Sequence, residues 1–212
     1  MNPYLAFKEK IKPSEITAIE KIESHPKVML SSLGSEDVEG YQVFTSQKTV
    51  KDMVNAIGLP KIRDLNATIL EPTSGDGAFT TFILLERLKA LDKKKDDFLF
   101  DTLRSLSTIY SIEMDKTLVV KQRNNLLTTL LLFLSKNKIS LPDGYEFVAK
   151  AIIYHNCIWA MFNSNPGTGT LFGVEVAYKM PNAAKGDYIS LQFPVWKITK
   201  DHIDYHTEDP EA

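Results

Sequence analysis

Residues 67–91 constrain the fold more than any other part of the sequence. A short apolar, partly β-branched run at 67–70 is typical of a strand buried in a parallel sheet. It leads into a glycine-containing turn at 71–77, and residues 79–91 then have strong helical periodicity. A strand, a glycine-rich turn and a helix in this order predict the opening unit of a nucleotide-binding α/β domain.

The chemistry of this turn indicates what kind of ligand it suits. Gly75 and Gly77 allow backbone torsions that other residues avoid, and they let a ligand approach the main chain. The helix that starts near Ala78 presents unpaired N–H groups, which attract a carboxylate as readily as a phosphate. Glu71 ends the strand and can pair with an ammonium group. The methionine part of S-adenosylmethionine carries both charges, whereas the Gly-Lys-Ser/Thr of a phosphate loop is missing. A tight turn without a ligand is an equally good interpretation of the two glycines alone.

The extended motif is more specific than the glycines alone. It resembles the first motif of the amino-adenine DNA methyltransferases of restriction–modification systems, which reads close to Leu-Glu-Pro-Ser-x-Gly-x-Gly-x-Phe. The positions in register are Leu70, Glu71, Pro72, Gly75, Gly77 and Phe79. The resemblance implies that S-adenosylmethionine is the cofactor and that residues 71–79, Asp76 among them, form its loop.

Two further segments resemble motifs of the same family. Upstream, Phe44 and Thr45 look like its aromatic-Thr-Pro cofactor motif, with Ser46 in place of the proline. In the family this region closes over the methionine end of the cofactor. Downstream, residues 109–115 look like the second motif. The resemblance implies that Glu113 accepts hydrogen bonds from the ribose hydroxyls and that Met114 packs on the adenine ring. The likeness covers about residues 43–125.

Alternatives remain open for the residues beyond the cofactor loop. Glu113 can also be read as a solvated acid at a strand end. Asn156 resembles the family's third motif, where a polar residue meets the adenine of the cofactor, but a plain strand end explains it equally well. Cys157, the single cysteine, is expected to be a buried structural thiol. His202 and His206 lack a clear third ligand, so no metal site is predicted.

The family's catalytic tetrapeptide, Asn/Asp/Ser-Pro-Pro-Tyr/Phe, does not occur in the sequence. Such a strand end cradles a flipped base and accepts hydrogen bonds from its amino group. Residues 164–167 contain an amide and one proline without a following aromatic residue, and 178–182 have a suitable context but place a lysine at the critical position. No catalytic residue is therefore assigned.

Charge and composition limit the partners and the location. The chain has 212 residues, a formal net charge of −2 and no global positive field, so DNA would be contacted through a local patch or a partner subunit. A homo- or hetero-oligomer fits the same requirement. The apolar run at 126–134 is much shorter than the about 20 residues of a membrane span. With one cysteine and no signal-peptide pattern, a cytoplasmic protein without membrane contact is expected.

The predicted organisation is an N-terminal helical arm (1–40), a methyltransferase-like domain (41–200) and a flexible C-terminal tail (201–212). Helices are expected at 49–57, 79–91 and 116–135, and strands at 67–70, 107–112, 151–159, 172–178 and 188–198. The fold class expected is α/β: a three-layer Rossmann-like methyltransferase domain with a mainly parallel sheet.

The function that follows is S-adenosylmethionine-dependent methylation of adenine amino groups in DNA. The main alternative is a catalytically silent relative, a binding or regulatory subunit that keeps the cofactor fold without the catalytic motif. Methylation of RNA, protein or a small molecule is a third interpretation, for which the sequence offers no acceptor site.

Overall fold

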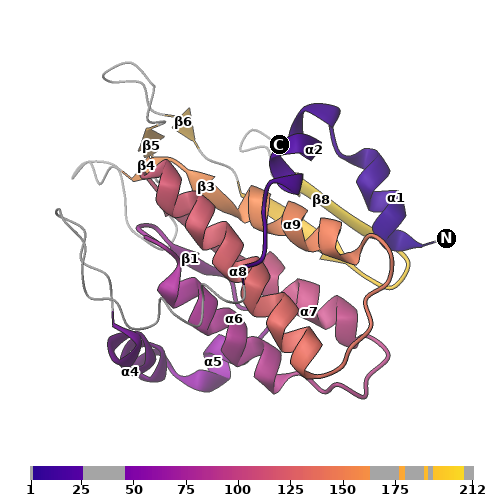
Figure 1. Ribbon diagram of the computed structural model, residues 1–212. Helices are drawn as coiled ribbons and strands as arrows, with labels where there is room; N and C mark the ends of the chain where they lie inside the picture. The colour runs from indigo at the N-terminus through magenta and orange to yellow at the C-terminus, as the bar shows by residue number, and fades with distance from the viewer. Residues whose placement is uncertain (1, 26–45, 163–176, 180–188, 191–192, 208–212) are drawn as a thin grey trace.

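The computed structural model describes residues 2–25, 46–162, 177–179, 189–190 and 193–207 of the chain (Figure 1). Within these ranges the protein is a mixed α/β structure. The helices are α1 (Pro3–Lys10), α2 (Pro13–Glu20), α4 (Gln47–Ile57), α5 (Leu59–Arg63), α6 (Ala78–Ala90), α7 (Phe98–Ser107), α8 (Lys116–Lys136) and α9 (Tyr145–Asn156). The strands are β1 (Ile69–Glu71), β2 (Ile109–Glu113), β3 (Cys157–Trp159), β4 (Met161–Phe162), β5 (Ala177–Lys179), β6 (Ile189–Ser190), β7 (Pro194–Ile198) and β8 (Ile203–Thr207).

A parallel three-stranded sheet in the order β1–β2–β3 forms the centre of the molecule. Its register pairs Glu71 with Ser111 and Glu113 with Trp159, so the three carboxyl ends lie along one edge of the sheet. All five residues of β2 are buried, because α6, α7, α8 and α9 all contact this strand. The loops that follow the strands are thereby held against a rigid core.

The local structure agrees with the periodicity of the sequence over residues 46–136. The helices expected at 49–57, 79–91 and 116–135 are confirmed as α4, α6 and α8, and the strands expected at 67–70 and 107–112 are β1 and β2. Side-chain caps fix two of the helix starts. Ser46 accepts the Thr49 N–H at the start of α4, and Asp115 accepts two N–H groups at the start of α8.

The expected parallel pairing holds for the central sheet only. β4, β5 and β6 pair antiparallel in a second small sheet, and β7 and β8 form an antiparallel hairpin. The strand expected at 151–159 is wrong for most of its length, because α9 continues to Asn156 and β3 comprises only three residues. Ala151, Ile152 and Ile153 are all buried. A helix that is buried on several sides has a continuous apolar run, which periodicity does not distinguish from a strand.

The hairpin also corrects the prediction of a flexible tail from residue 201, since Ile203–Thr207 form strand β8. Ile203 pairs with Ile198, and both side chains are buried. Trp196 pairs with Tyr205, with the two ring centroids 4.7 Å apart. Residues 203–207 contain polar residues between these apolar and aromatic positions, so the sequence did not predict a strand there. The strand is recognised only from its pairing with β7.

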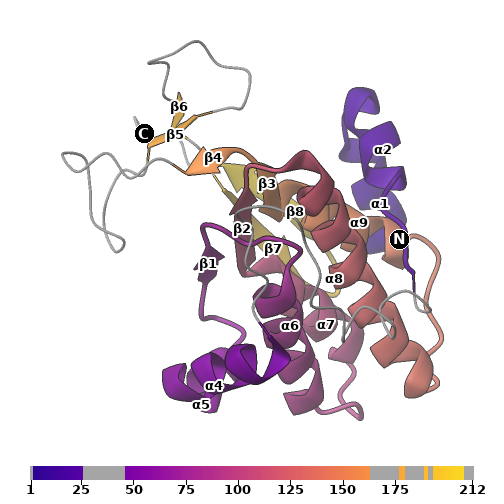
Figure 2. The same cartoon turned by 60° about the vertical axis from the view of Figure 1, so that its left-hand side comes forward.

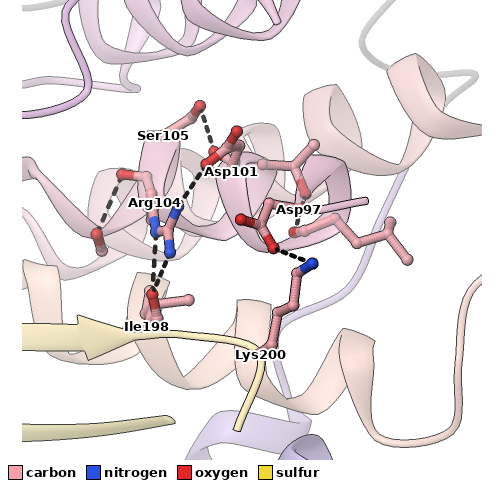
Figure 3. Close-up of polar contacts among 9 residues, drawn as sticks. Asp97, Asp101, Arg104, Ser105, Ile198 and Lys200 are labelled. Atoms are coloured by element: carbon pink, nitrogen blue, oxygen red, sulfur yellow. Dashed lines mark hydrogen bonds and ion pairs between the residues drawn. The ribbon is translucent and has the colours of Figure 1, made fainter. Parts of the chain in front are cut away.

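Polar contacts fix the hairpin to α7 (Figure 3). Arg104 donates from Nε and Nη2 to the Ile198 carbonyl, at 2.9 and 2.8 Å, while its Nη1 pairs with Asp101 at 2.6 Å. Lys200, just beyond β7, pairs with Asp97 at 3.2 Å. At the start of β7, Tyr110 of β2 donates to the Pro194 carbonyl at 2.7 Å. The hairpin is therefore attached to both a helix and the central sheet.

In the described part of the predicted N-terminal arm, residues 2–25, helices α1 and α2 pack on α9. Tyr4 and Phe7 of α1 and Ile19 of α2 are part of the core. The segment after α2 crosses α8, where Asn124 Oδ1 accepts the Glu23 N–H at 3.0 Å. In Figures 1 and 2 the arm lies on the side of the molecule opposite β1.

His155 of α9 lies where the arm, α9 and the hairpin meet, and it makes stability depend on pH. Its Nε2 lies 4.0 Å from Glu15 of α2 and has no hydrogen-bond partner among the described residues. Burial lowers the pKa of His155 below its ordinary 6.5; Glu15 opposes this shift, and Arg123 and Lys12 add to it. The unfolded chain then binds this proton more tightly than the native state, so stability falls as the pH drops below 6.5.

We expect the free energy of unfolding to fall by up to about 1.4 kcal/mol per pH unit between pH 6.5 and the lowered pKa of His155. Urea unfolding on both sides of this window, compared between the native protein and His155→Phe, measures the effect. The same pH dependence in both proteins would show that another group is responsible.

In the described part of the chain, no helix combines the length and the apolar character that crossing a membrane requires.

Candidate functional site

Three predicted features meet at the carboxyl edge of the central sheet: Glu71 at the end of β1, Glu113 at the end of β2 and the turn between β1 and α6. The turn folds back over the edge, with the Ser74 N–H donating to the Ile112 carbonyl at 3.0 Å. In open α/β sheets, ligands bind outside the carboxyl ends of the strands. The structure therefore brings the principal predicted residues to the position where such a ligand is expected.

Glu113 connects the two loops of the site. Its Oε2 accepts the Gly75 N–H at 2.8 Å, and its Oε1 accepts the Asp115 N–H at 2.9 Å. The residue is 9 % exposed, so it is not the solvated acid of the alternative interpretation. An ionised carboxylate has about four acceptor positions, and these two contacts leave the others for a ligand hydroxyl.

Glu71 is half-buried, and burial raises the pKa of its carboxyl group above the ordinary 4.5, an effect that a backbone hydrogen bond from Thr73 opposes. No ion pair of Glu71 is found among the described residues. A carboxylate that has lost part of its hydration without gaining a cation destabilises the fold at neutral pH. A ligand ammonium group would supply the missing charge.

The two glycines of the turn have different surroundings, although both have positive φ. A Cβ added to Gly75, at φ +56°, would meet nothing within 4 Å among the residues that the structure describes. A Cβ on Gly77, at φ +84°, would lie 2.4 Å from Cγ of Gln122. Gly77 is thus required by the protein's own packing. Gly75 borders open space beside the Glu113 carboxylate, where a ligand can reach the main chain.

Helix α8 supports the turn from below, a role that sequence reasoning missed. The amide of Gln122 accepts from the Ser74 hydroxyl at 2.9 Å and lies 3.1 Å from the Thr80 hydroxyl, to which it donates. Asn125 donates to the Asp76 carbonyl at 3.0 Å. The available signal was a glutamine on the buried stripe of α8, between Val119 and Leu126.

Trp159, at the end of β3, is a second residue at the edge that was not predicted as part of the site. Its indole N–H donates to the Met114 carbonyl at 2.9 Å, and Lys116 Nζ lies 5.1 Å from the ring centroid. Met114, predicted to pack on adenine, is 59 % exposed at the same edge. A half-exposed indole and a thioether beside Glu113 provide surfaces on which a flat ring can pack.

The remaining predicted residues of the loop have contacts within the protein. Asp76 pairs with Lys121 of α8 at 3.0 Å. Phe79 packs against the hydrophobic core, and Pro72 is half-buried within the turn. Phe44 and Thr45 lie outside the described residues, as do the segments 164–167 and 180–182, which come nearest to the catalytic tetrapeptide.

Asn156 is not brought to the site. It ends α9 and precedes β3, at the amino end of the sheet. Its Nδ2 donates to the carbonyls of Ser107 and Ile109, both at 3.1 Å, while its Oδ1 accepts the Trp196 indole N–H at 2.9 Å. The predicted contact with the cofactor is therefore corrected: this buried amide ties the hairpin to the core. The strand assumed at 151–159 had put Asn156 at the wrong end of the sheet.

Two other features lack the chemistry of the carboxyl edge. Cys157 is buried, and burial raises the pKa of its thiol, as expected for a structural cysteine. A hollow of about 500 Å³ lies between α1 and α2, on the arm. Its lining is mostly apolar. The helices that line it, α1 and α2, lie far from β1 in both views (Figures 1 and 2).

The edge as a whole offers Glu71, a carboxylate that pairs with no cation among the described residues, and Glu113, a carboxylate with acceptor positions to spare. It also offers a half-buried main-chain turn and a surface for a flat ring. This set suits a ligand that combines an ammonium group, a sugar and a purine. Comparison with protein-family models, with curated proteins and with solved structures finds no match to this chain.

Proposed function

We propose that the carboxyl edge binds S-adenosylmethionine and that the protein is a methyltransferase of the type that acts on adenine amino groups in DNA. The observation that carries the proposal is the open approach to Gly75 between two carboxylates, Glu71 and Glu113. A motif resemblance over residues 70–79 supports the same ligand. The Rossmann-like three-layer arrangement belongs to this proposal as well.

Each part of the cofactor has a partner in this arrangement. Glu71 pairs with the ammonium group, and the main chain near Gly75 faces the carboxylate at the start of α6, which has no side-chain cap. Glu113 accepts from the ribose hydroxyls while keeping its contacts to the Gly75 and Asp115 N–H groups. Met114 and Trp159 contact the adenine ring.

The bound cofactor supplies an electrophilic methyl group on a sulfonium. The residues of this chain bind and orient it, and the fixed turn reduces the entropy lost when the two reactants are aligned. Binding of the acceptor requires a site that holds the flipped adenine, and no residue is assigned to this site. The proposal also includes DNA contact through a local patch or a partner subunit, and an oligomeric protein.

A catalytically silent relative is the second candidate function, because the Asn/Asp/Ser-Pro-Pro-Tyr/Phe tetrapeptide is absent from the sequence. In this case the chain binds the cofactor and serves as a binding or regulatory subunit. Incubation of the protein with S-adenosylmethionine carrying a labelled methyl group and with mixed DNA distinguishes the two candidates. Label in adenine supports the enzyme, and cofactor binding without transfer supports the silent relative.

Calorimetric titration with S-adenosylmethionine tests the site itself. We expect the native protein to bind and Glu71→Gln to lose about a hundredfold in affinity. In this variant the ammonium group of the cofactor would face a neutral amide instead of a carboxylate. Affinity should also fall as the pH drops toward the raised pKa of Glu71, where the carboxylate becomes protonated.

The stability of the same variant provides a second measurement. Because burial penalises the charged form of Glu71, Glu71→Gln should keep or raise the free energy of unfolding while it loses affinity. The matched control is Glu146→Gln, a change in an exposed carboxylate of α9 that pairs with Lys150 at 3.0 Å. No binding by the native protein at millimolar cofactor would refute the proposal.

A further inference from the structure

Gln122 of α8 is a buried polar side chain that makes its hydrogen bonds to the turn. It is 1 % exposed, and its amide lies between two hydroxyl groups that flank the glycines: Ser74 before them and Thr80 after them. Ser74 is 8 % exposed and Thr80 is fully buried. A buried amide that is satisfied by both sides of one turn restricts the turn to the conformation that both contacts allow.

The packing of Gln122 adds a steric constraint to these hydrogen bonds. Its Cγ occupies the space that a side chain on Gly77 would need, so the glutamine stem lies directly against the main chain of the turn. Gly77 in turn donates from its N–H to the Ser74 carbonyl at 2.9 Å. The turn is closed on itself and lies against Gln122, while Gly75 stays on its open side.

We propose that Gln122 is a positioning residue, which holds residues 74–80 in the conformation that presents Gly75 and the Glu113 carboxylate to the ligand. The effect on cofactor affinity rests on the proposed function, whereas the effect on the turn does not. Gln122 itself touches no part of the ligand in this account, and it acts through Ser74 and Thr80.

The variant Gln122→Met tests this role because it removes the amide but keeps the length of the side chain. Neither hydroxyl loses every acceptor, since Ser74 is 3.3 Å from the Ile112 carbonyl and Thr80 is 3.1 Å from that of Gly77. The fold should therefore survive. We expect affinity for S-adenosylmethionine to fall about ten- to hundredfold, as when outer-shell contacts of a binding site are lost. Amide hydrogen exchange at Ser74 and Gly77 should become at least about tenfold faster.

The matched control is Thr128→Val, which alters another buried polar residue of the same helix. Thr128 accepts the His25 N–H at 2.8 Å and lies beyond the contacts with the turn. This variant should change neither the affinity nor the exchange of the turn. Ser74→Ala, which removes the contact from the other side, should reproduce the direction of both effects, and its combination with Gln122→Met should be less than additive.

The outcomes separate the two proposals. Gln122 has no positioning role if the Ser74 and Gly77 amides of Gln122→Met exchange at rates within twofold of those in the native protein. The same conclusion follows if Thr128→Val lowers the affinity as much as Gln122→Met does. If the native protein binds no S-adenosylmethionine while Gln122→Met still loses protection of the turn, the proposed function fails and the positioning role stands.

Discussion

Replacing Arg87 with methionine is expected to lower the free energy of unfolding by about 3–5 kcal/mol. Arg87 of α6 is fully buried. It donates to the carbonyls of Ile62 at 2.9 Å, Ala67 at 2.5 Å and Ser105 at 3.2 Å, and to the Thr108 hydroxyl at 2.6 Å. Methionine fills much of the space but leaves these acceptors without the donors they now have.

The cost is large because Arg87 joins segments that are remote in sequence and lead into β1 and β2. Burial lowers the pKa of its guanidinium to about 10, and Asp64 opposes this shift, so the group remains charged at neutral pH. Carbonyl and hydroxyl oxygens rather than carboxylates accept its hydrogen bonds. Arg87→Lys should also be costly, since a single ammonium cannot reach acceptors arranged around a planar fork.

Urea unfolding of Arg87→Met against the native protein measures the loss. Arg63→Met is the control, because Arg63 is 40 % exposed and its buried partner Glu86 keeps a second ion pair, with Lys89 at 2.8 Å, so the loss should be less than about 1 kcal/mol. Equal midpoints for the two variants would contradict the assigned role of Arg87.

Alanine at Gly77 should mainly reduce stability, whereas alanine at Gly75 should mainly reduce ligand binding. At Gly77 the new Cβ would lie 2.4 Å from Cγ of the buried Gln122, and φ is +84°. Overpacking costs about 1–3 kcal/mol and a left-handed conformation about 1–2 kcal/mol more. We therefore expect Gly77→Ala to lose about 2–5 kcal/mol of stability.

Gly75→Ala should lose only about 1–2 kcal/mol, the cost of the left-handed conformation, because a Cβ there lies within 4 Å of no atom in the described part of the chain. In the proposed complex, its methyl group would instead occupy the space through which the cofactor approaches the main chain. We expect this variant to remain folded and to lose S-adenosylmethionine binding by about a hundredfold, as when a binding geometry is displaced by about 1 Å.

Thermal unfolding and calorimetric titration of both variants test this pair, and each variant is the control for the other. A folded Gly75→Ala protein with native affinity would exclude a ligand at this turn. Native stability in Gly77→Ala would mean that Gln122 does not pack against the turn as described.

The sequence alone determined the elements whose signals are local. The strand, turn and helix of residues 67–91 were predictable because β-branched residues, glycines and helical periodicity act within a few positions of each other. The placement of Glu71 and Glu113 at one edge followed from the same signals, since consecutive parallel strands end at the same edge of a sheet. The resemblance to the methyltransferase motifs added a ligand hypothesis to this geometry.

Tertiary structure alone decided which residues support that edge and which are excluded from it. Gln122 reaches Ser74, and Trp159 reaches Met114, across more than forty residues of chain. Asn156 instead serves the hairpin, because α9 extends through a run that reads equally well as a strand. Such contacts depend on how helices pack on the sheet. The sequence around a buried amide does not indicate which distant hydroxyl group it will bond.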